Sequence, residues 1–108
     1  MEDLLRETEA LSEVLREHKG QETCVLDLRK INNWTDFFII ATASSKTHLD
    51  GLERHIIDHC RQNKIEVMGR SRKNSDEEWR IIDLGPIIIH LMTSEARAFY
   101  ELERLWNR

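Results

Sequence analysis

The segment from residue 36 to residue 43 constrains the fold of this chain more than any other. It reads Asp-Phe-Phe-Ile-Ile-Ala-Thr-Ala, without the alternation of polar and apolar residues that marks a strand with one wet face. A short, uniformly apolar strand is typical of the interior of a sheet, where both of its faces are covered. We therefore expect residues 36–43 to form a central strand.

Helical patterns lie on either side of this strand in the sequence. Apolar residues at helical spacing predict a first helix over residues 4–18, and Gly20 stands where a helix commonly ends. Ser44, Ser45 and Thr47 offer N-cap oxygens to a second helix, and Thr93 or Ser94 can cap a last helix that ends near Trp106. The apolar face of the second helix is formed by Leu49, Leu52, Ile56 and Cys60.

Four further segments have extended patterns, at residues 23–28, 65–68, 79–84 and 87–92. The last two flank Gly85-Pro86, which indicates two strands joined by a tight turn, and residues 69–78 are predicted to form a polar loop. The resulting order is helix, strand, strand, helix, three strands and helix. It predicts the α/β class, with one mixed β-sheet covered by helices in a single domain over residues 1–108.

Composition limits the compartment and the partners. With 40% hydrophobic and 33% charged residues, the chain resembles an ordinary globular protein. It has no apolar run of the roughly 20 residues that cross a bilayer, and its first residues are acidic where a targeting segment is basic. Cys24 and Cys60 lie in apolar patterns typical of free, buried thiols. We expect a cytoplasmic protein without membrane association.

Charge argues against a nucleic-acid wrapping protein. The net charge is −4, whereas a protein that follows a phosphate backbone needs clustered Lys and Arg. The basic run at residues 70–73 is followed by the acidic run at residues 76–78, within a Debye length of about 8–10 Å. We interpret this stretch as a solvated loop, with a local phosphate contact as the alternative, and expect no sequence-specific nucleic-acid partner.

Three histidines of the second helix resemble a row of metal ligands. His48, His55 and His59 are seven and four residues apart, which places them along one flank of a helix with about 100° per residue. However, the segment lacks the glutamate that follows the first histidine in zinc hydrolases, and no Cys or acidic partner stands at ligand spacing. A partly exposed polar flank is the preferred interpretation. Adventitious metal and a pH-sensitive contact remain as alternatives.

Aspartates in or beside strands raise the question of catalysis. Asp27, Asp36 and Asp83 are such residues, but neither Asp27 nor Asp83 has a second carboxylate two residues later, the spacing that nucleotide-transferring enzymes use to hold metal. Structural roles at strand ends, or pairing with Arg, are favoured. The sequence also lacks a glycine-rich phosphate loop and a Gly-x-Ser-x-Gly motif. We expect no catalytic residue, metal site or cofactor.

The segment from Trp79 to Trp106, here called the tail block, contains more aromatic and charged residues than a core requires. Such residues are enriched at protein interfaces. Phe99, Leu102 and Trp106 share one helical stripe and are expected in the core. Trp79, which opens an edge-like hairpin, and Tyr100, which points away from the stripe, fit either a core position or an exposed contact.

The tail block resembles the signature of the ribosomal silencing factor family, RsfS/Iojap. The similarity rests on Trp79-x3-Asp83-x-Gly85-x4-His90, followed by Glu95-x-Arg97-x2-Tyr100-Glu101-Leu102-Glu103-x2-Trp106. Upstream, Leu26-Asp27, Thr35-Asp36 and the Ala41-Thr42-Ala43-Ser44-Ser45 run ending near His48 also resemble the family. The likeness therefore extends over nearly the whole chain.

This resemblance implies a homodimer with a fold related to nucleotidyltransferases but without their active site. It also implies a translation repressor that binds the large ribosomal subunit on the ribosomal protein numbered fourteen and blocks joining of the small subunit when nutrients are scarce. The partner-binding residues carried over are Trp79, Asp83, His90, Glu95, Arg97, Tyr100 and Glu101. Among them we expect Trp79 and Tyr100 to make apolar contact and the two glutamates to meet basic groups.

Two positions depart from the family pattern. Pro86 stands where an acidic residue is common, and the basic run at residues 70–73 replaces a loop that is usually more acidic and richer in glycine. Both could alter docking. Two other classes of function stay open at this point: a nucleotide-handling enzyme of the nucleotidyltransferase type, and a metal-responsive interaction module that uses the three histidines.

Overall fold

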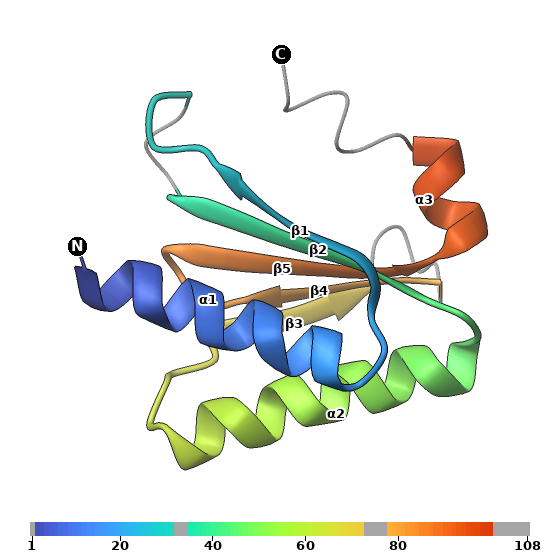
Figure 1. The fold of residues 1–108 in the computed structure, drawn as a ribbon, viewed down its shortest axis with the longest axis horizontal. Helices are drawn as coiled ribbons and strands as arrows, with labels where there is room; N and C mark the ends of the chain where they lie inside the picture. Colours follow the sequence, from blue (N-terminus) through green and yellow to red (C-terminus); the bar gives the residue numbers. More distant parts are fainter. Residues whose placement is uncertain (1, 32–34, 73–77, 101–108) are drawn as a thin grey trace.

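A computed structural model describes residues 2–31, 35–72 and 78–100, in which a five-stranded sheet is flanked by helices (Figure 1). The elements follow one another in the predicted order. They are α1 (Glu2–Glu17), β1 (Gln21–Asp27), β2 (Phe37–Ala43), α2 (Lys46–Gln62), β3 (Gly69–Arg72), β4 (Trp79–Asp83), β5 (Ile87–Thr93) and α3 (Ser94–Tyr100). The prediction of one mixed sheet with helices is confirmed.

The strand order across the sheet is β1-β2-β5-β4-β3. β2 and β5 pair in parallel, and the other neighbours pair antiparallel. Every residue of β2 and of β5 is buried, which explains why both segments lack polar alternation. The prediction that the segment ending at Ala43 is a central strand is confirmed, since β2 lies between β1 and β5.

The two faces of the sheet carry different cores. α1 and α2 lie together on one face, and α3 lies on the other (Figure 1). We call these the α2 face and the α3 face. Because neighbouring residues of a strand point in opposite directions, Phe37, Ile39 and Ala41 of β2 pack on the α2 face, whereas Phe38 and Ile40 pack on the α3 face.

The third strand does not lie where the sequence pattern placed it. Residues 65–68 are not a strand; β3 covers Gly69–Arg72, inside the predicted loop. Ile65 donates its backbone N–H to Cys60 O at 2.8 Å, which closes the end of α2, and Met68 donates to Asp83 O at 2.8 Å. Ile65 and Val67 pack against the core of the α2 face from this connection, so their alternating pattern reflects burial rather than a strand.

The ends of the helices agree with the predicted caps. The Ser45 side chain accepts a hydrogen bond from His48 N at 3.1 Å at the start of α2. Thr93 Oγ1 accepts from Ala96 N at 3.4 Å at the start of α3. The predicted continuation of α3 to Trp106, with Leu102, lies outside the described residues.

Candidate docking surface

Trp79 and His90 form the centre of the tail block on the α3 face. Trp79 Nε1–H donates to His90 Nδ1 at 3.1 Å, and the ring of Phe38 meets His90 edge-on with centroids 4.6 Å apart. The antiparallel register pairs Trp79 with Met92, which places the indole diagonally next to His90. These side chains form a packed aromatic group that connects three neighbouring strands.

The interpretation of Trp79 as an exposed contact is wrong in this structure. Only 3% of Trp79 is exposed, and β4 is an interior strand because β3 extends the sheet beyond it. His90, at 6% exposed, is also a core residue. Their position in the signature is explained by packing and by a buried hydrogen bond, which a core aromatic with a polar atom requires.

Arg97 joins α3 to the sheet. Arg97 is 6% exposed, and its guanidinium donates from Nη1 to Thr42 Oγ1 at 2.6 Å and more distantly to Gln21 O at 3.5 Å. Nη2 lies 3.6 Å from the Sγ of Cys24, a free cysteine as expected. A buried charge needs such partners. Arg97 therefore fixes the position of the helix and offers little surface to a partner.

Asp83 shapes the turn between β4 and β5. Its Oδ1 accepts from Gly85 N at 2.8 Å, and Gly85 has a φ of +92°, a conformation that glycine adopts without steric cost. The next residue, Pro86, is exposed, and its carbonyl accepts from Asp36 N at 2.9 Å and Phe37 N at 3.0 Å. The departure at Pro86 thus lies in a solvent-facing turn that is well bonded to β2.

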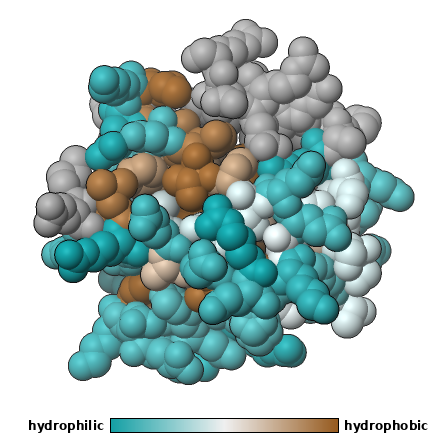
Figure 2. Space-filling model, viewed as in Figure 1, coloured by the Kyte–Doolittle hydropathy of each residue, from teal (hydrophilic) through white to brown (hydrophobic). Residues whose placement is uncertain are grey.

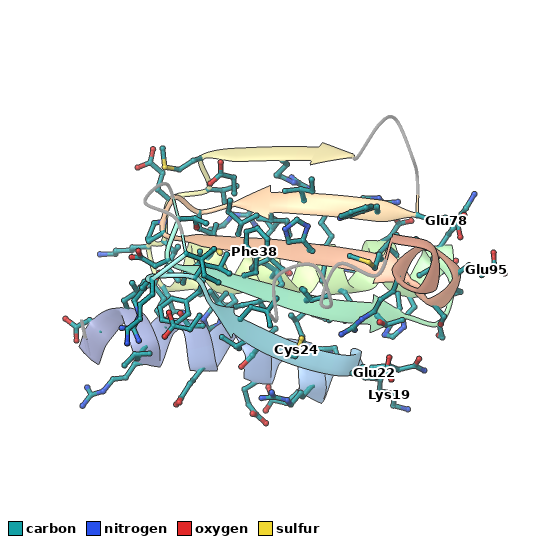
Figure 3. The ribbon with its side chains drawn as sticks, turned by 90° about the horizontal axis from the view of Figure 1, so that it is seen from above. Lys19, Glu22, Cys24, Phe38, Glu78 and Glu95 are labelled. Carbon is teal, nitrogen blue, oxygen red and sulfur yellow. The ribbon has the colours of Figure 1, made fainter. Side chains whose placement is uncertain are left out.

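Glu95 is an exposed acidic residue of the predicted set. It lies in the first turn of α3, and Figure 3 shows it at the same end of the sheet as Glu78. Glu78 Oε1 accepts from Thr93 Oγ1 at 2.8 Å, which positions the first turn of the helix. The side chains of Phe99 and Tyr100, and the whole of Glu101, lie outside the described residues.

The aspartates have the structural roles expected from the sequence, as far as their contacts are described. Asp27 accepts from Arg29 through Nε at 2.9 Å, Nη2 at 2.6 Å and the backbone N at 3.0 Å. The side-chain bond, followed by the backbone bond, lowers the pKa of Asp27 from 3.8 to about 2. Within the described ranges, no group of three or more His, Cys, Asp or Glu side chains is arranged to hold a metal ion.

Two of the three histidines of α2 contact His18 at the end of α1, and the third contacts a residue at the end of α2. The His55 ring stacks on His18 of α1 with centroids 3.4 Å apart. His48 accepts from Ser44 N at 2.9 Å and its Nε2 lies 2.9 Å from His18 O, whereas His59 lies beside Asn63. They are half-buried, which agrees with a partly exposed polar flank.

The pattern of the sequence did not predict which large apolar residues are exposed. The exposed fractions are 65% for Met68, 52% for Ile31, 40% for Leu5 and 37% for Val25. Leu5 and Val25 border a groove of about 370 Å³ between α1 and β1, and Figure 2 shows hydrophobic side chains gathered on this side of the molecule. The signal was Val25, an apolar residue on the outward side of an edge strand. None of the described helices is long and apolar enough to span a bilayer.

Comparison with known proteins identifies close similarity over nearly the whole chain. Residues 2–108 match the family model described as "Ribosomal silencing factor during starvation". Proteins named ribosomal silencing factor RsfS from Treponema pallidum and Haemophilus influenzae are 36% and 35% identical; the matches cover 91% of this chain in both cases and 87% and 95% of those proteins. A crystal structure of a Chromobacterium violaceum protein superposes with a TM-score of 0.85 at 25% identity, covering 94% of this chain and 85% of that one.

Proposed function

The chain belongs to the ribosomal silencing factor family, and from this membership we propose that it binds the large ribosomal subunit, on the ribosomal protein numbered fourteen, and prevents the small subunit from joining. Translation then falls when nutrients are limiting. The match of the family model to residues 2–108 is the observation that carries the proposal. The protein acts in the cytoplasm, as a homodimer, by steric exclusion and without catalysis.

The residues of the tail block divide into two groups in this proposal. Trp79, His90 and Arg97 are buried and hold β4, β5 and α3 in place. Glu95 is exposed and Asp83 is half-buried, and we assign contact with the partner to these two together with Tyr100 and Glu101. An acidic surface suits a basic ribosomal protein, because charge complementarity accelerates association and orients the partners.

Sedimentation of purified subunits tests the proposal. The protein should co-sediment with large subunits and not with small subunits at moderate salt, and it should lower the yield of joined ribosomes when both subunits are mixed. Tyr100→Ala should weaken both effects without unfolding the protein, because truncation of an aromatic residue at an interface centre commonly weakens binding by tenfold or more. Unchanged joining at saturating protein would refute the proposed mechanism.

The homodimer is tested separately. Light scattering coupled to size-exclusion chromatography should give about twice the 12.8 kDa mass of the chain. A mass that stays at that of one chain at micromolar concentration would exclude the dimer and leave ribosome binding to be judged by sedimentation alone.

A further inference from the structure

A pocket of about 480 Å³ lies on the α2 face, between α2 and the strands β3 and β4. Four arginines line it: Arg54 and Arg61 from α2, Arg70 from β3 and Arg80 from β4. Arg70 of β3 lies opposite Ile82 of β4 in the antiparallel pair. Ile82 is two residues after Arg80, so Arg70 and Arg80 project from the same face of the sheet. Figure 2 shows a hydrophilic surface over α2 on the side of the molecule that it displays.

Arg80 is an unusual residue for an interior strand. It is 6% exposed, and its Nη1 donates to Asp50 Oδ1 at 2.7 Å and to Glu53 Oε1 at 2.9 Å. Its Nε–H is buried without an acceptor in the described part of the chain. Burial acts to lower the pKa of Arg80, but the bonds to the two carboxylates outweigh it and raise the pKa, so the guanidinium stays charged.

Glu53 orients two of the guanidiniums. Its Oε1 accepts from Arg80, and its Oε2 accepts from Arg70 through Nε at 3.0 Å and Nη2 at 2.8 Å. Nη1 of Arg70 is left without a bond among the described residues, and so is the exposed guanidinium of Arg54. The carboxylates therefore align the arginines and leave some of their N–H donors unused.

The balance of charge in the pocket favours an anion. Three carboxylates line it, from Asp50, Glu53 and Asp58, so the four guanidiniums leave one positive charge in excess. This excess occurs on a chain whose net charge is −4. A planar guanidinium matches the oxygens of a phosphate with two parallel hydrogen bonds, and arginine is the residue most suited to this geometry.

We propose that the pocket between α2 and the β3–β4 pair binds a phosphate group, which accepts hydrogen bonds from Arg80, Arg70 and Arg54. Both the buried Arg80 and the exposed Arg54 line this pocket. The phosphate can belong to an RNA backbone or to a small phosphorylated molecule. The same N–H donors serve both, and competition between them identifies the source.

Nuclear magnetic resonance of the arginine Nε–H groups of the full chain tests the site directly. Inorganic phosphate should shift the Arg80 Nε–H resonance in a saturable way, whereas chloride at equal ionic strength should not. Arg54→Gln should weaken phosphate binding by about tenfold, the effect of one charge-assisted hydrogen bond. Arg6→Gln, which removes the same charge from an exposed position on α1, should leave the affinity unchanged.

The absence of a saturable shift at Arg80, or equal weakening by Arg54→Gln and Arg6→Gln, would overturn the proposal. Added oligouridylate and uridine 5′-monophosphate then separate the sources: displacement of phosphate by the oligonucleotide at a far lower concentration of phosphate groups assigns the site to RNA, and equal displacement assigns it to small phosphorylated molecules. The experiment contains no ribosomes, so its outcome is independent of the proposed silencing function.

Discussion

Arg97 on α3 donates a hydrogen bond to Thr42 on β2 across 2.6 Å, although the two residues are 55 positions apart in the sequence. Both side chains are buried. Since a buried guanidinium is costly without partners, this contact determines where α3 can lie on the sheet. The exposed Glu95, two residues before Arg97 on α3, is positioned by the same anchor.

Thr42→Val tests this anchor. The change keeps the shape of the side chain but removes the acceptor for Arg97, and hydrogen bonds to charged groups contribute roughly 1.5–3 kcal/mol. We expect the free energy of unfolding in urea to fall by about 2 kcal/mol. Thr47→Val, at an exposed position in the first turn of α2, should change it by less than about 0.5 kcal/mol. Equal effects of the two changes would contradict the anchor.

Trp79→Phe separates packing from direct contact. The variant keeps an aromatic ring but loses the N–H that donates to His90, and it leaves a small cavity. We expect a loss of about 2 kcal/mol in the free energy of unfolding. The affinity of the folded variant for large subunits should stay unchanged, because Trp79 is buried. Lost affinity with normal stability would instead indicate that Trp79 touches the partner.

The contrast between Trp79 and the central strand illustrates what sequence can predict. The uniformly apolar segment at residues 36–43 indicates a strand that is buried on both faces. The central position of β2 in the sheet could therefore be predicted from these residues alone. The burial of Trp79 depends on β3, a short polar strand that pairs with β4. Nothing local to Gly69–Arg72 marks a strand, because its stability comes from ladder hydrogen bonds and from the pairing of Arg70 with Glu53.

The site residues also divide into those that a local sequence pattern identifies and those that only the fold brings together. Asp83 and Gly85 were identifiable, because an aspartate two residues before a glycine is a common turn pattern. The arginine pocket could not be identified from the sequence. Arg54 and Arg80 are far apart in the sequence, and they line the same pocket because α2 and β4 come together in the folded chain. An isolated arginine within an apolar strand was the available signal.

Acid should weaken the fold through Asp27. Its folded pKa of about 2 lies below the ordinary value of 3.8, so the stabilisation is present above 3.8 and is lost as the pH falls through about 2. The pair is exposed, so solvent screening makes the effect far smaller than the shift alone would give. A carboxyl NMR titration should place the Asp27 midpoint near 2. Arg29→Gln should return the midpoint towards 3.8, and an unshifted midpoint in the unaltered protein would contradict the ion pair.

His55 should make stability depend on pH near neutrality. Burial, then the neighbouring His18 and Arg54, lowers its pKa below 6.5, and Asp58 opposes them weakly. The unfolded state therefore binds the proton first, so stability is present above 6.5 and decreases as the pH falls from 6.5 to the lowered pKa. Urea unfolding at about pH 7.5 and about pH 5.5 should show this loss. His55→Gln should reduce this difference in unfolding free energy between the two pH values, whereas His59→Gln should not. If both variants kept the full difference, it could not be assigned to His55.

Charge reversal at Glu95 distinguishes local docking from general electrostatic attraction. Glu95→Lys and Glu17→Lys both replace an exposed glutamate on a helix and change the net charge by the same amount, but Glu17 is on α1, across the sheet from α3. If Glu95 meets a basic group of the ribosome, its reversal should weaken co-sedimentation with large subunits by roughly tenfold, since like charges at an interface are repulsive. Glu17→Lys should weaken it only slightly, and that weakening should disappear at higher salt. Equal losses for the two variants would remove Glu95 from the docking surface.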